Sequence, residues 1–122
     1  MIIKLKRVYA DYDNADGYRV LVDRLWPRGM KKESLKFDLW EKDITPSTEL
    51  RKWFHSDQAQ NWEEFATRYR IELQSSGVLS RFVDTLKGQS VVTLLYASKN
   101  ESQNHALVLK SELERELHKQ GL

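Results

Sequence analysis

The apolar run Val91–Ala97, with the sequence VVTLLYA, constrains the fold more than any other stretch. Its apolar residues occupy both odd and even positions, a pattern typical of a central strand in a parallel sheet that is covered on both faces. A second apolar run, residues 18–23, predicts another buried strand. Residues 24–90 between them are long enough for the crossover that a parallel pair requires. We therefore expect an α/β fold, with a small, mostly parallel sheet packed by helices, and a single domain over residues 1–122.

Four stretches carry apolar residues at helical spacing: residues 47–55, 57–77, 78–88 and 104–119. Ser47, Asp57 and Asn104 stand at the starts of three of them. Their side-chain oxygens are suited to accept hydrogen bonds from the free backbone amides of a helix N-terminus. The first three helices fill the crossover between the two buried strands, and the fourth closes the chain.

Two further segments are less regular. Apolar and basic residues alternate over residues 1–9, which predicts a strand with one exposed face. The connection of about eight residues after it allows a hairpin but is short for a crossover, so the direction of this strand stays open. Phe37, Trp40 and Ile44 lie three and four positions apart, and we expect a short helical segment there.

The composition excludes several classes of function. The chain has no cysteine, which rules out disulfides, thiolate metal sites and a cysteine nucleophile. No apolar run approaches roughly 18 residues, and the N-terminus lacks the pattern of a signal peptide, so we expect a cytoplasmic protein without a membrane partner. The net charge of +2 does not by itself indicate nucleic-acid binding. Residues 1–36 nevertheless hold nine Lys and Arg against five Asp and Glu, which makes this third of the chain a candidate electropositive face.

Metal and nucleotide-cofactor motifs are absent from the sequence. The three histidines form no His-x-x-x-His pair and give no ligand set for zinc. Asp11, Asp13 and Asp16 resemble part of a calcium loop, but Gly17 and the strand after it break the required spacing. The chain contains no glycine-rich phosphate loop and no Gly-x-Ser-x-Gly element. We therefore expect no metal and no cofactor.

The stretch Val22–Gly29, with the sequence VDRLWPRG, ends the second strand with two guanidiniums and an indole. Together with LWEKDITPS over residues 39–47, LLYASK over residues 94–99 and Asn104-His105-Ala106, it resembles the short, YeaO-like branch of the domain-of-unknown-function 488 family. The likeness covers essentially the whole chain. It implies a compact α/β fold and a cytoplasmic protein of bacterial type, with no established activity. Longer relatives have a Cys-His-Arg element where this chain has Asn104-His105-Ala106, so thiol chemistry is out of reach here.

The predicted site is an anion-binding cleft. Ligands of parallel α/β sheets bind beyond the carboxyl ends of the strands, where strands 18–23 and 91–97 would meet the start of the last helix. Guanidinium, ammonium and free helical amide groups favour phosphate or carboxylate. The predicted anion-binding residues are Arg24, Arg28, Lys99, Asn104 and Ser98. The predicted pocket-lining residues are Trp26, Tyr9 and Tyr96.

Two residues are candidates for proton transfer. His105 would lie in the first turn of a helix, whose dipole favours the neutral ring, and a neutral imidazole can serve as a general base. Asp23 would orient an arginine or act as a base itself. On this interpretation the protein is an enzyme, or the relic of one, that acts on a small phosphorylated or otherwise anionic substrate.

Two alternatives stay open at this point. The first is a nucleic-acid-associated module that binds through the basic N-terminal face, formed by Lys4, Lys6, Arg7, Arg28, Lys31 and Lys32. The second is a scaffold without a ligand. In it, Arg24 pairs with Asp23 or Asp43, and Arg28 braces its loop against Trp26 or Trp40.

Overall fold

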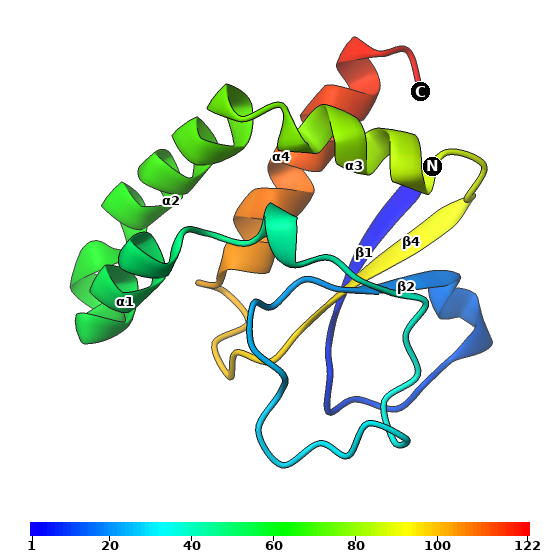
Figure 1. Ribbon diagram of the computed structural model, residues 1–122, viewed down its shortest axis with the longest axis horizontal. Helices are drawn as coiled ribbons and strands as arrows, with labels where there is room; N and C mark the ends of the chain where they lie inside the picture. The colour runs from blue at the N-terminus through cyan, green and yellow to red at the C-terminus, as the bar shows by residue number, and fades with distance from the viewer.

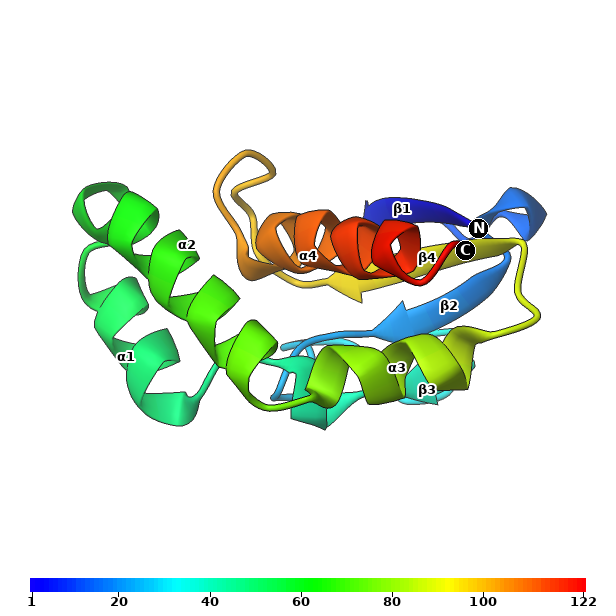
Figure 2. The same ribbon diagram turned by 90° about the horizontal axis from the view of Figure 1, so that it is seen from above.

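A four-stranded sheet, with every strand parallel to its neighbours, forms the centre of the computed structural model, which describes residues 1–122 (Figures 1 and 2). The order across the sheet is β1-β4-β2-β3. The strands are β1 (Ile2–Arg7), β2 (Tyr18–Leu21), β3 (Leu39–Trp40) and β4 (Val91–Tyr96). β4 lies between β1 and β2, and its residues 92–96 are buried. The predicted α/β class and the central place of this strand are therefore confirmed.

The direction of β1, which the sequence leaves open, is parallel to β4. Because β4 lies between β1 and β2, residues 8–17 connect two strands that are not neighbours. This connection contains a short 3-10 helix, Asn14–Asp16, and ends at Gly17. Gly17 has a φ of +65°, and a Cβ atom there would lie 2.4 Å from the carbonyl oxygen of Val91. Only glycine fits this approach of the chain to the start of β4.

The prediction of a helical segment over residues 37–44 is wrong for its first half. Leu39 and Trp40 form β3, which pairs with β2, and only Lys42–Ile44 is helical, as a 3-10 turn. The amides of Asp38 and Glu41 donate to the carbonyl oxygens of β2 residues, at 2.7 Å and 2.9 Å. The edge of β2 that β4 leaves free thus supplies hydrogen-bond partners for the backbone of residues 38–41, and the segment pairs with it instead of forming a helix.

The four predicted helices are present as α1 (Thr48–Ser56), α2 (Gln58–Ser75), α3 (Val78–Leu86) and α4 (His105–Lys119). Ser47, Asp57 and Asn104 cap α1, α2 and α4 through their side-chain oxygens, as expected. Figure 2 shows α1 and α2 standing beyond the end of the sheet toward which β2 and β4 point. None of the helices is both long and apolar enough to span a membrane.

The two faces of the sheet are covered differently. The main core joins residues of all four helices to one face, which includes Val20 and Leu94. The opposite face is closed by the loop after β2, whose Trp26, Met30 and Leu35 pack near Leu21 and Leu95. The loop after β2, which carries Arg24 and Arg28, is therefore anchored to the sheet by its own apolar residues.

Candidate anion-binding cavity

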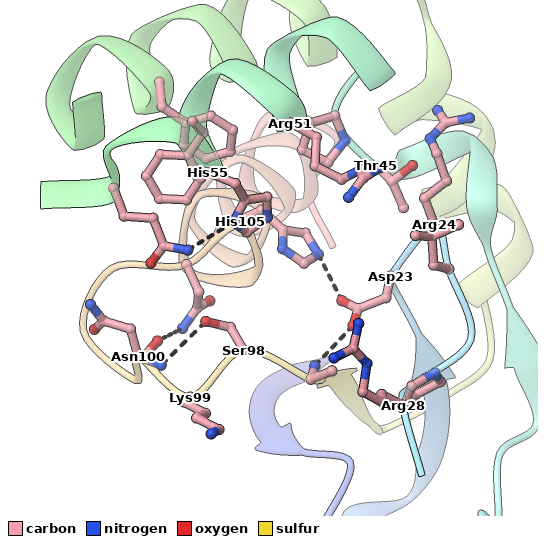
Figure 3. Close-up of a pocket in the computed structure, with 18 of the residues that line it drawn as sticks. Asp23, Arg24, Arg28, Thr45, Arg51, His55, Ser98, Lys99, Asn100 and His105 are labelled. Carbon is pink, nitrogen blue, oxygen red and sulfur yellow. Dashed lines mark hydrogen bonds and ion pairs between the residues drawn. The ribbon is translucent and has the colours of Figure 1, made fainter. Parts of the chain in front are cut away.

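A cavity of about 560 Å³ opens beyond the carboxyl ends of β2 and β4 (Figure 3). Its walls come from the loop after β2, the loop after β4, the start of α4, and residues of α1 and the segment before it. Pockets of roughly 300–1,000 Å³ are typical of small-molecule sites. The position agrees with the rule that ligands of parallel α/β sheets bind at this edge.

Nine of the ten predicted site residues line this cavity: Tyr9, Asp23, Arg24, Trp26, Arg28, Ser98, Lys99, Asn104 and His105. Tyr96 is the exception. It is 4% exposed and belongs to the main core below the cavity.

Sequence reasoning missed the contribution of α1. Arg51 and His55 line the cavity, followed by Gln58 at the start of α2. Positions 51 and 55 are one helical turn apart and therefore share a face. That face adjoins the buried one marked by Leu50 and Phe54, so the helical spacing groups the two side chains but does not show that they face the cavity.

The cavity wall carries a net positive charge, and its cationic side chains have no ion-pair partners. None of the eight ion pairs of the protein includes Arg24, Arg28, Arg51 or Lys99. The Nε atoms of Arg24 and Arg51 are buried and have no hydrogen-bond partner. A buried donor without a partner costs about 1–3 kcal/mol, so native proteins rarely keep one without a reason. Asp23 is the sole acidic residue of the lining.

The contacts expected for a scaffold without a ligand are not present. Arg24 forms no ion pair with Asp23 or Asp43. The cation above the Trp40 ring, 4.1 Å from its centroid, is Lys42 and not Arg28. Trp26 instead packs edge-to-face against Trp40 and donates its indole N–H to the carbonyl of Met30 at 2.6 Å. Trp26 therefore holds the loop in shape while the arginines stay unpaired.

Asp23 links the ends of β2 and β4 and lies beside His105, and its Oδ1 is buried without a hydrogen-bond partner. Its Oδ2 accepts the backbone N–H of Ala97 at 2.9 Å, and its Oδ1 lies 3.2 Å from Nε2 of His105. The same Nε2 lies 2.8 Å from the carbonyl oxygen of Val22. Because a carbonyl oxygen only accepts, Nε2 carries the proton. A neutral His105 then keeps the lone pair of Nδ1 free to accept a proton or a hydrogen bond.

Ser98 and Asn104 hold the loop after β4. Asn104 donates from Nδ2 to the carbonyl of Asn100 at 2.8 Å, and its Oδ1 caps α4 at the amide of Leu107. Ser98 Oγ accepts the amide of Asn100 at 3.2 Å. These side chains shape the cavity, while Lys99 between them is exposed and unpaired.

Half of the basic N-terminal face, Lys4, Lys6 and Arg7, is engaged in contacts within the protein. Lys6 Nζ lies 3.0 Å from a carboxylate oxygen of Asp16. The guanidinium of Arg7 donates to the carbonyl of Ser98 at 2.9 Å, and the ammonium of Lys4 donates to that of Ala15 at 3.1 Å. These interactions leave fewer free cations for a nucleic acid than the sequence suggests.

His55 provides a pH-dependent test of the cavity. His55 is exposed, but partial burial of its ring lowers its pKa from the usual 6.5, and the nearby positive charge of Arg51 acts in the same direction. The folded protein therefore binds this proton less readily than the unfolded chain, and stability falls as the pH drops through 6.5. When the pH is lowered from about 8 to 5, we expect the melting temperature of His55→Gln to fall by less than that of the wild type. Thermal unfolding followed by circular dichroism measures it, with the exposed His118→Gln as control; equal losses in all three proteins would contradict this prediction.

The fold and the cavity define a parallel α/β protein with a cation-lined cavity at the carboxyl ends of its strands. The chain belongs to the DUF488 family: residues 2–121 match the family model described as "Inactive DUF488-N3 subclade". This confirms the resemblance seen in the sequence.

Two relatives show how far the similarity extends. The chain is 53% identical over 110 residues to the uncharacterized protein YeaO of Escherichia coli K12, covering 89% of this chain and 94% of that protein. It is 45% identical over 107 residues to the uncharacterized protein Rv3073c of Mycobacterium tuberculosis H37Rv, covering 88% and 89% of the two chains. No solved structure matches the chain.

Proposed function

We propose that this protein binds a small anion, bearing a phosphate or carboxylate group, in the cavity beyond β2 and β4. The observation that carries the proposal is the set of four cationic side chains that line one cavity without a single ion-pair partner. Uncompensated like charges repel one another, and two of them leave a buried donor unsatisfied. An anion would supply the missing acceptors, and arginine binds carboxylate and phosphate through two parallel hydrogen bonds.

Binding without catalysis has the better support. The family description calls the subclade inactive, and the chain has no cysteine. His105 then serves as a hydrogen-bonding group whose orientation the Val22 carbonyl maintains. Proton transfer by His105 and Asp23 on an anionic substrate is the alternative, since Nδ1 of His105 has no protein partner.

Calorimetric titration with inorganic phosphate and with sulfate at low ionic strength tests the proposal. We expect one saturable site with a Kd of about 1 mM or tighter, which corresponds to roughly −4 kcal/mol. Absence of binding by both ions would overturn it.

A single-stranded oligonucleotide distinguishes the nucleic-acid alternative. Binding through phosphate neutralisation would weaken by orders of magnitude between about 50 and 200 mM salt. On our proposal the oligonucleotide does not compete with phosphate. Oligonucleotide binding with that steep salt dependence, undiminished by phosphate, would favour the basic N-terminal face.

A further inference from the structure

The charge of the cavity exceeds what a single anionic group would balance. Arg24, Arg28, Arg51 and Lys99 stand against one carboxylate, that of Asp23, which leaves three positive charges in excess. A phosphate monoester carries about 1.5 to 2 negative charges near pH 7. One such group would leave part of the positive charge uncompensated in a partly buried site.

The cations are also spread over separate walls. Arg24 and Arg28 come from the loop after β2, Arg51 from α1, and Lys99 from the loop after β4. In Figure 3, Lys99 lies beside Ser98 and Asn100, across the cavity from Arg51 and Arg24. Cations at opposite ends cannot all contact one small anionic group.

Apolar side chains also line the cavity. Phe54 and Leu25 line the cavity together with Pro27 and Pro46. Leu25 is 60% exposed, so its apolar surface is open to contact with a molecule bound in the cavity. The cavity of about 560 Å³ is within the range of roughly 300–1,000 Å³ that holds a drug-sized organic molecule.

We propose that the ligand is a small organic molecule with two separated anionic groups, one held at the end lined by Arg24 and Arg51 and the other by Lys99. This inference rests on the proposed anion-binding function and specifies its ligand class. The apolar lining contacts the body that joins the two groups, and Arg28 at the rim balances the remaining negative charge.

A series of bisphosphonates tests the spacing of the two groups. The probes are methylenebisphosphonate, propylenebisphosphonate and pentylenebisphosphonate, with pentylphosphonate as the matched single-group control, each titrated calorimetrically at constant ionic strength. We expect the affinity to peak at one linker length and to exceed that of pentylphosphonate by at least about tenfold, because the second group then binds as part of the same molecule. We expect Arg51→Met and Lys99→Met each to remove most of that advantage.

The variants separate this inference from the proposed function. Pentylphosphonate should lose affinity in only one of the two variants, because it occupies one end of the cavity. Bisphosphonates that bind no tighter than pentylphosphonate, or equally at every linker length, would overturn the two-group ligand while leaving anion binding intact. If neither the phosphonates nor inorganic phosphate bind, both proposals fail.

Discussion

Replacing Arg51 with methionine is expected to weaken phosphate binding by about 10- to 100-fold without lowering the melting temperature. Hydrogen bonds to charged groups contribute about 1.5–3 kcal/mol, which sets the expected loss of affinity. The guanidinium has no ion-pair partner in the protein, and its Nε is buried without an acceptor. Methionine keeps much of the apolar stem and removes that unsatisfied donor, so we expect the free energy of unfolding to stay equal or to rise by about 1 kcal/mol. Calorimetric titration and thermal unfolding measure the two effects.

Weaker phosphate binding together with an unchanged melting temperature would distinguish a ligand-binding role of Arg51 from a structural one. Arg81→Met is a suitable control, because Arg81 is an exposed arginine on α3 outside the cavity. It should change neither quantity appreciably. An Arg51→Met protein that melts at a lower temperature and binds phosphate as before would show that Arg51 is structural. Arg51→Lys should retain part of the affinity, since lysine keeps the charge but loses the two-pronged geometry.

The local patterns of the sequence predicted most of the fold because they need no knowledge of distant partners. Apolar spacing and the capping residues Ser47, Asp57 and Asn104 are read within a few positions of each helix. The two features that local patterns did not predict depend on pairing across the chain. The direction of β1 follows from the insertion of β4 between β1 and β2, and β3 forms by pairing with the edge of β2 that β4 leaves free.

The candidate site likewise combines residues that local sequence patterns place and residues that depend on how distant segments pack. Residues just after β2 and β4 were predictable, because parallel strands bring their carboxyl ends to one edge of the sheet. Arg51 and His55 were not, because their place depends on how α1 stands beyond that edge (Figure 2). Tyr96 was misplaced for a geometric reason: successive residues of a strand face opposite sides, and the side that Tyr96 faces is the main core.

Asp16→Asn is expected to destabilise the protein by about 3–5 kcal/mol, the usual cost of removing one partner of a buried ion pair. Asp16 is 5% exposed and forms an ion pair with Arg19, which is 3% exposed, and another with Lys6 at 3.0 Å. Asparagine has nearly the same shape but no charge, so the guanidinium of Arg19 would be left buried and uncompensated. Urea unfolding measures the loss. Asp84→Asn breaks an exposed pair with Lys87 and should cost less than about 1 kcal/mol.

The pH dependence of this difference identifies its origin. Burial raises the pKa of Asp16, but hydrogen bonds from Lys6, the amide of Asp13 and Arg19 outweigh it, and the net pKa lies below the usual 3.8. A carboxyl whose pKa is lowered by folding contributes stability that is fully present above the unfolded value and is lost as the pH falls through the folded one. The gap in unfolding free energy between wild type and Asp16→Asn should therefore stay constant above about pH 5 and narrow below 3.8. A gap that stays constant into strong acid would mean that shape rather than charge explains the loss, and that the carboxylate does not stabilise the junction of β1, β2 and the turn before β2.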